Sequence, residues 1–250
     1  MNAKEISKKI KLHLKRLEIK RSNNIVIHSD LITFGIYHSL LPKIFFKSLI
    51  SIIGSKGTIA LPIYNIDLDK KKIIDLNKDF NPSENSSLSK YFFKKFKYTK
   101  TKSIFHSHMI KGPLEKKFSN NVNHNSFGDN SDFDFFYKNN FKLLLFGCDA
   151  AKACTYLHHI EDKFKPRYRV KKVFKVKIKI NKTIVDKYIT YQVRKKNIKL
   201  NFNKIFFLKK IKKITKTAKL KFGKSYLVNI REFDHLCSKI IRKKKNILIA

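Results

Sequence analysis

Three side chains in the segment 155–161 could carry out proton-transfer chemistry. Thr155, His158 and Glu161 follow one another at intervals of three residues, so on a helix they lie on one face. A neutral imidazole can accept a proton from an amine or a hydroxyl group near pH 7, and a neighbouring carboxylate can orient the ring or hold an ammonium group. His159 points about 100° away around such a helix. Because structural pairs at this spacing are common, the pattern indicates a catalytic face only when its context supports it.

The elements around this segment predict an α/β fold. Short apolar segments that end at turn residues are typical of buried strands, and longer segments with apolar residues at helical spacing are typical of amphipathic helices. The predicted strands are 25–27, 57–62, which ends at Pro62, and 141–146; the predicted helices are 3–17, 40–53, 87–96 with Ser86 or Ser87 as N-cap, and 155–164. Functional residues of such folds gather at the carboxyl ends of strands. The segments 28–30, 62–64 and 147–149 are therefore the places to search.

Two further regions complete the chain. The segment 98–130 contains His106, His108 and His124 but has little periodicity, which is typical of a functional loop. After Pro166 the pattern changes: 170–180 and 184–193 predict a hairpin, 203–214 and 231–242 predict helices, and 217–222 predicts a strand before Gly223. We therefore predict an α/β part over 1–166 and a smaller, basic α+β part over 167–250 that packs into the same domain.

The chain of 250 residues carries a formal net charge of +39. Such a charge favours polyanionic partners. Lysine supplies nearly all of it, however, whereas arginine makes the bidentate contacts to phosphate and guanine. The lysines are also spread among Ile, Asn and Phe residues, as a coding bias would produce, which argues against nucleic acid as the partner. The absence of a long apolar segment and of a secretory pattern predicts a cytoplasmic protein without a membrane partner.

The cysteines Cys148, Cys154 and Cys237 form no C-x-x-C pair. Their spacing argues against a disulfide framework and against a zinc site, so buried free thiols are the simpler interpretation. Cys154 lies next to Thr155, which leaves open an alternative in which an acyl group is carried on its thiol.

Five short motifs follow one another along the chain. They are His28-Ser29-Asp30-Leu31 with Gly35, Gly57-Thr58-Ile59-Ala60-Leu61-Pro62, Lys100-Thr101 with Ser107, Ser126-Phe127-Gly128 with Ser131, and Leu145-Phe146-Gly147 before Thr155, His158 and Glu161. Together and in this order they resemble the aminoglycoside 3-N-acetyltransferase family, whose patterns are H-S-S-L-x-x-x-G, G-T-[LI]-x-x-P, R-[ST]-x-x-P-x-x-S, S-F-G-x-x-S and L-L-G before T-x-x-H-x-x-E. Asp30, Lys100 and Ile104 stand where the family has Ser, Arg and Pro. Lysine keeps the charge of arginine but loses its fork of donors.

The resemblance implies the α/β fold of that family, which differs from the fold of the GNAT acetyltransferases: a central sheet flanked by helices with a smaller α+β C-terminal part. It implies acetyl-coenzyme A as co-substrate, no metal, and direct transfer of the acetyl group to an amine. His158 would be the general base and Glu161 its partner. Thr155 would help to position the thioester or to stabilise the oxyanion.

The other site residues follow from the same resemblance. The residues expected to bind the cofactor are His28, Ser29, Asp30, Leu31, Gly35, Lys100, Thr101 and Ser107, and those expected to contact the acceptor are Tyr64 and Asp129. Asp132 and Asp134 lie near Asp129 and are interpreted as solvated loop carboxylates. With only 18 acidic residues, the chain fits an amino sugar better than a polycationic aminoglycoside, although the resemblance implies a role in antibiotic resistance. Alternatives are a basic nucleic-acid-binding protein and a non-catalytic family member; a homo-oligomer stays open.

Overall fold

The computed structural model describes residues 1–64, 73–75, 78–79, 86–120, 125–180 and 182–250. A seven-stranded sheet has the strand order β4-β5-β2-β1-β6-β10-β9. Its strands are β1 (Asn24–Ser29), β2 (Thr58–Tyr64), β4 (Thr99–Lys100), β5 (His106–Lys111), β6 (Lys142–Phe146), β9 (Thr215–Leu220) and β10 (Gly223–Asn229). The central strands β2, β1 and β6 run parallel to one another, and the outer strands are antiparallel to their neighbours.

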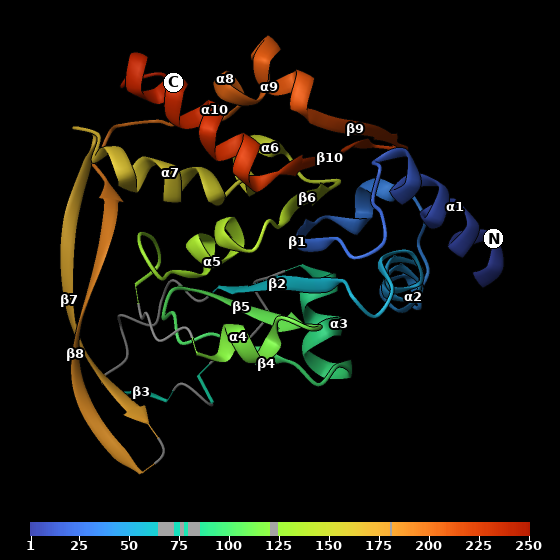
Figure 1. The fold of residues 1–250 in the computed structure, drawn as a ribbon, viewed down its shortest axis with the longest axis horizontal. Helices are drawn as coiled ribbons and strands as arrows, with labels where there is room; N and C mark the ends of the chain where they lie inside the picture. Colours follow the sequence, from blue (N-terminus) through green and yellow to red (C-terminus); the bar gives the residue numbers. More distant parts are fainter. Residues whose placement is uncertain (65–72, 76–77, 80–85, 121–124, 181) are drawn as a thin grey trace.

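Helices cover both faces of this sheet (Figure 1). They are α1 (Ala3–Arg16), η1 (Leu31–Phe34), α2 (Leu41–Ile53), α3 (Ser87–Lys95), α4 (Glu115–Ser119), α5 (Asp132–Lys138), α6 (Ala150–Ala153), α7 (Tyr156–Phe164), α8 (Asn203–Phe206), α9 (Lys209–Ile214) and α10 (Ile230–Lys243). Alternate residues of β1 separate two apolar clusters: Ile25 and Ile27 pack with α1, α2 and α3, whereas Val26 packs with α5, α7 and α10. This alternation is the period-two pattern of a strand that is buried on both faces.

A long hairpin stands beside the main body (Figure 1). The strands β7 (Arg169–Ile180) and β8 (Thr183–Arg194) pair along their whole length, and β3 (Ile73–Asp75) adds a parallel third strand. The start of β7 directly follows α7, so the hairpin is connected to the helix that carries His158. The predicted hairpin after Pro166 is thus confirmed.

The α/β prediction is confirmed, but several predicted boundaries are wrong. The strand β2 continues through Pro62 to Tyr64. It pairs with β1 from Thr58 to Ala60, whereas its pairing with β5 extends to Tyr64. Proline has no N–H to donate and is tolerated where a strand pairs on one side only.

The interpretation of 98–130 as irregular is also wrong in part, because this segment contains β4, β5 and α4. The strand β5 lacks the apolar pattern of a buried strand, because His106, Ser107 and His108 are polar although all three are buried. Near the C-terminus, the predicted helix 203–214 is divided in two by Leu208, whose backbone is extended. Gly223 does not merely end a strand but begins β10, which inserts between β6 and β9.

Candidate functional site

The face of α7 that carries Thr155 and His158 opens toward solvent. Both side chains are half-buried, whereas Tyr156 and Leu157 between them are buried. His159 is also buried, and its ring stacks on Phe133 at a centroid distance of 6.1 Å. The helix therefore presents His158 rather than His159 to a ligand.

His158, Glu161 and Arg169 meet at one point. The Nδ1 atom of His158 lies 2.6 Å from Oε2 of Glu161, and Nη2 of Arg169 lies 2.6 Å from the same oxygen and 2.6 Å from that Nδ1. We assign the ring proton to Nδ1, which then donates to Glu161, while Arg169 donates to the same carboxylate oxygen. The short distance between Nη2 and Nδ1 follows because both donors share that oxygen. The Nε2 atom of His158, which makes no hydrogen bond within the described part of the chain, then carries the lone pair that a general base needs.

The charges of this triad follow from burial and pairing. Burial lowers the pKa of His158 below its ordinary value of 6.5, although the Glu161 carboxylate opposes this. Burial alone would raise the pKa of Glu161, but hydrogen bonds from His158 and Arg169 lower it to about 2. At neutral pH the site thus holds a neutral imidazole beside an ionised carboxylate and a guanidinium group.

Arg169 and Tyr168 were missed from the sequence. The Tyr168 hydroxyl group donates to Oε1 of Glu161 at 2.7 Å, so both carboxylate oxygens have partners. Arg169 also donates to the backbone oxygen of Gln192, which ties it to β8. Both residues come to Glu161 across the turn that ends α7 at Lys165, whose backbone is left-handed with φ 42°. Tyr168 and Arg169 follow Glu161 by seven and eight residues, but the helix ends between them, so helical spacing could not predict these contacts. The scarcity of arginine was the signal available.

A second polar cluster lies under Thr155. The Tyr64 hydroxyl group is 3.2 Å from Nε2 of His108, whose Nδ1 is 2.8 Å from Oδ2 of Asp132. The Tyr64 ring also lies 4.9 Å from the ring of His106, centroid to centroid. Nδ1 of His106 is 2.8 Å from the Ser126 hydroxyl group, and burial lowers the pKa of His106 to about 3. The structure therefore places Tyr64 among the imidazole rings of His106 and His108.

The loop after β1 is closely packed against the end of β6. His28 is buried, and burial lowers its pKa to about 3, while the Ser29 hydroxyl group donates to Ser86, which caps α3 as predicted. Asp30 caps η1, in which Leu31 is buried, and Gly35 ends η1 with φ 71°. A Cβ atom on Gly147 would lie 1.9 Å from Oγ1 of Thr33. Only glycine permits this approach.

The other predicted cofactor residues lie elsewhere in the sheet. Lys100 is on β4, and β5 and β2 separate that strand from β1. Burial lowers the pKa of Lys100 to about 7, against the influence of Asp75 and Asp79. Thr101 donates to Asp132 at 2.7 Å, and the buried Ser107 hydroxyl group donates to the backbone oxygen of Ser103. The structure therefore does not bring these three residues together with the loop 28–35.

The aspartates of the segment 129–134 differ from one another. Asp129 is exposed in the turn before α5. The interpretation of Asp132 and Asp134 as solvated loop carboxylates is wrong, because both are buried at the start of α5. Oxygen atoms of Asp134 accept from the backbone N–H of Asn130 and from Lys138, so this carboxylate stabilises the turn and the helix N-terminus.

The Cys154 thiol is poorly suited to carry an acyl group. It is buried, and burial raises its pKa to about 12, whereas the thiolate is the nucleophilic form. Within the described residues, no group of three or more His, Cys, Asp or Glu side chains could hold a metal ion, and no helix is long and apolar enough to cross a membrane.

Comparison with known proteins shows the same fold in solved structures. Among solved structures, AAC-IIIb bound to CoASH matches with a TM-score of 0.78 and 13% identity over 95% of this chain and 96% of that one. YokD from Bacillus subtilis matches with a TM-score of 0.75 and 16% identity over 94% and 98%. A mutant of AAC(3)-IVa in complex with gentamicin gives 0.75 and 16% over 97% and 90%. These similarities confirm the predicted fold.

Sequence comparison gives the family. No curated protein matches the chain significantly. The model of the family described as aminoglycoside 3-N-acetyltransferase matches residues 26–241. The chain therefore belongs to the aminoglycoside 3-N-acetyltransferase family and is an acyltransferase.

Proposed function

We propose that this enzyme transfers the acetyl group of acetyl-coenzyme A directly to an amine of an amino sugar or aminoglycoside, with His158 as general base. The observation that carries the proposal is the half-buried His158 ring, whose Nδ1 is held by Glu161. As the acceptor nitrogen attacks the thioester carbonyl carbon, Nε2 takes its proton, and collapse of the tetrahedral intermediate releases the coenzyme A thiolate. Glu161 keeps the ring in the reactive tautomer and stabilises the imidazolium that forms. Arg169 in turn keeps Glu161 ionised.

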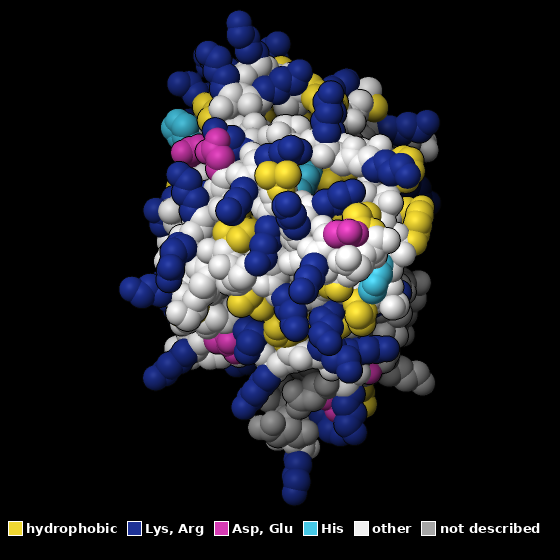
Figure 2. All heavy atoms as spheres, turned by 90° about the vertical axis from the view of Figure 1, so that its right-hand side faces the viewer, with side chains coloured by type: hydrophobic (Ala, Val, Ile, Leu, Met, Phe, Trp, Pro, Cys, Tyr) yellow, Lys and Arg dark blue, Asp and Glu magenta, His cyan; other side chains and the backbone are white. Residues whose placement is uncertain are grey.

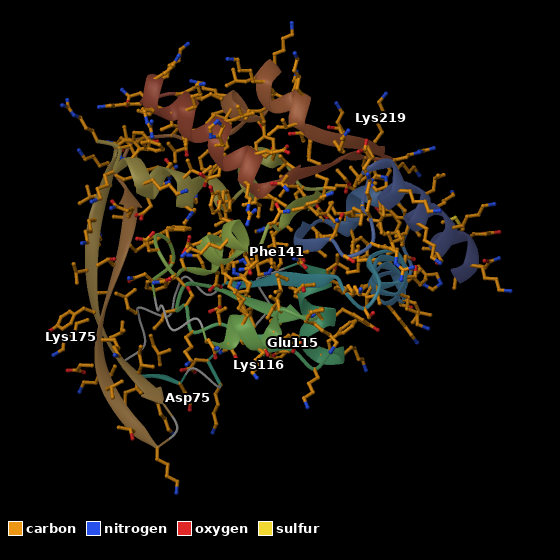
Figure 3. The ribbon with its side chains drawn as sticks, in the orientation of Figure 1. Asp75, Glu115, Lys116, Phe141, Lys175 and Lys219 are labelled. Carbon is orange, nitrogen blue, oxygen red and sulfur yellow. The ribbon has the colours of Figure 1, made fainter. Side chains whose placement is uncertain are left out.

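The loop 28–35 supports binding of coenzyme A. A cavity of about 500 Å³ adjoins Gly35 and is lined by basic side chains of α1 and β9. Its basic residues include Lys9, Arg16, Lys219 and Lys221, and Lys219 is seen on β9 beside α1 (Figure 3). Such a surface attracts the phosphate groups of the cofactor. We propose that the loop and this cavity hold coenzyme A, with its thioester end toward Thr155.

The acceptor should carry little positive charge. Burial is the main cause of the lowered pKa of His158; the charges of Arg169 and Arg194 lower it further, and Glu161 opposes them. Two guanidinium groups therefore lie near the base, and Glu161 neutralises one of them. A polycation pays an electrostatic cost in approaching them. We therefore propose that amino sugars, particularly those with an anionic group, are better acceptors than aminoglycosides.

An acceptor panel tests both statements. We expect amines on sugars to release free coenzyme A from acetyl-coenzyme A, and the rate with an anionic amino sugar to exceed the rate with a kanamycin-like amine. Transfer to kanamycin-like amines with none to amino sugars would contradict the proposed preference. If no amine accelerates release but the protein binds nucleic acid with a steep salt dependence, the transferase proposal itself fails.

The pH dependence of kcat is a further prediction. His158 must be neutral to act as base, so activity falls as the pH drops through its pKa; because burial holds that pKa below 6.5, we expect an acid limb below pH 6.5. Protonation of the acceptor amine also lowers kcat at low pH, and the pH at which it does so shifts with the pKa of the amine used. The measurement is kcat against pH with acceptors of different amine pKa. A profile in which every acid limb moves with the acceptor would argue against His158.

The face that contains α1 and α2 does not favour the polyanion-binding alternative. Figure 2 shows Lys and Arg side chains spread over the face that contains α1 and α2, between apolar and uncharged atoms, rather than gathered in one patch. Specific nucleic-acid sites concentrate their basic residues along one face or groove.

A further inference from the structure

A cavity of about 400 Å³ lies between the C-terminal ends of α7 and α10, near the start of the hairpin (Figure 1). The cationic side chains that line it are Lys165, Arg167, Arg242 and Lys245. The lysines of this protein are diffuse, but two of its seven arginines line this one cavity. The arginines distinguish the cavity from the generally basic surface.

The four cations of this cavity are not paired with carboxylates. Within the described part of the chain, no acidic residue lines the cavity, and none of the four side chains makes a hydrogen bond or an ion pair. Burial raises the pKa of Asp162 and the charge of Lys165 opposes this, but the two side chains form no ion pair. By contrast, Lys163 on the same helix is paired with Asp234 at 2.7 Å.

The helix ends at the cavity do not balance its charge. The C-terminus of a helix carries about half a negative charge, so α7 and α10 together offset about one of the four positive charges. The cavity therefore has a positive potential that attracts anions.

The two arginines of the cavity are held in place by their surroundings. The N–H of Arg169 donates to the backbone oxygen of Pro166 at 2.9 Å, which closes a turn around Arg167. The guanidinium group of Arg242 lies over the ring of Phe164, 5.9 Å from its centroid. Such contacts restrict a cation before it binds and so reduce the entropy lost on binding.

We propose that the cavity between α7 and α10 binds the phosphoryl group of a small organic phosphate. A planar guanidinium group makes bidentate contacts to phosphate oxygens, and lysine adds a point charge. Phe164 and the buried Ile241 give the cavity an apolar wall against which the organic part of the ligand can pack. The site is distinct from the proposed base, because Phe164 follows His158 by six residues and so points about 120° away around the helix.

Binding of inorganic pyrophosphate to the full chain tests the proposal. Both arginines are exposed, so Arg167→Gln/Arg242→Gln should fold while losing two charges from the cavity. We expect its affinity for pyrophosphate at this site to fall roughly 10- to 100-fold, the effect of losing a charge-assisted hydrogen bond. The matched control is Arg21→Gln/Lys94→Gln, which removes two charges from exposed positions elsewhere and should bind like the wild type. Titration calorimetry at constant ionic strength measures all three proteins.

Two further measurements identify the source of the phosphoryl group. If another organic phosphate supplies it, pyrophosphate still binds in the presence of saturating coenzyme A, and the cavity variant keeps the wild-type KM for acetyl-coenzyme A. We expect this result, because the loop 28–35 is proposed to hold coenzyme A. If coenzyme A supplies the phosphoryl group, it displaces pyrophosphate, and the cavity variant has a raised KM for acetyl-coenzyme A; the cavity then binds phosphate as proposed, but as part of the cofactor site.

The comparison of the two double variants can overturn the proposal. Equal weakening in both would show that pyrophosphate responds only to the net charge of the protein, and unchanged affinity in both would show that the cavity does not bind it. Because this comparison requires no catalysis, either outcome would leave the proposed acetyl transfer untouched.

Discussion

The His158→Ala variant is expected to lose roughly 10²- to 10⁴-fold in kcat, the usual contribution of a general base. The reason is geometric: Nδ1 of His158 is committed to Glu161 at 2.6 Å, which leaves Nε2 as the proton acceptor on the open face of α7. The cofactor site proposed at the loop 28–35 does not include this ring, so we expect the KM for acetyl-coenzyme A to change little. Initial rates of coenzyme A release with a saturating acceptor measure the loss.

Two controls separate chemistry from folding. His235 is exposed on α10, so His235→Ala removes the same side chain at a remote position and should keep full activity. The thermal midpoint of His158→Ala should remain close enough to that of the wild type for the variant to be folded at the assay temperature. A folded His158→Ala enzyme with wild-type kcat would refute the assignment.

The motif around His158 could be predicted from the sequence because its information is local. Three residues at helical spacing define a face, and five ordered motifs supply the context. The Gly147 motif is likewise local, because the close approach of Thr33 to Gly147 permits no side chain there. Helical spacing also selected His158 rather than His159 as the candidate base, and the structure shows His159 buried in the core.

The partners of that motif could not be predicted, because they come from distant segments or across turns. Arg169 reaches Glu161 after the left-handed residue Lys165 ends the helix, and periodicity does not extend through such a turn. His108 and Asp132 are 24 residues apart. Their polar character suggested a loop and solvated carboxylates, whereas each neutralises the cost of burying the other. Patterns of hydrophobicity therefore fail where buried polar groups satisfy one another.

Glu161→Ala is expected to destabilise the protein by about 3–5 kcal/mol, the usual cost of removing one partner of a buried ion pair. The side chains of Glu161 and Arg169 are 0% and 5% exposed, so the variant leaves a guanidinium group in the interior without its carboxylate. Tyr168 loses its acceptor as well. Urea unfolding at pH 7 measures the difference in the free energy of unfolding.

The hairpin offers a matched control for this loss. Lys175 and Asp186 form an ion pair between β7 and β8 whose side chains are 58% and 44% exposed, and Lys175 lies on the outer side of the hairpin (Figure 3). Asp186→Ala should therefore cost less than about 1 kcal/mol. Replacing Arg169 by Met in the Glu161→Ala background should recover part of the stability, because the unpaired charge is gone. Equal costs for Glu161→Ala and Asp186→Ala would show that the buried pair has no special role.

The lowered pKa of Glu161 predicts how the stability of the protein depends on pH. The pKa of about 2 in the folded protein is below its ordinary value of 4.5, so folding favours the ionised form. The stabilisation is fully present above pH 4.5 and is lost as the pH falls toward 2, because protonation breaks the contacts with His158 and Arg169. Glu161→Gln lacks this titration, so the difference in unfolding free energy between wild type and variant should shrink over that interval. A difference that stays constant from pH 7 to pH 2 would mean that Glu161 is not held as an ionised partner of Arg169.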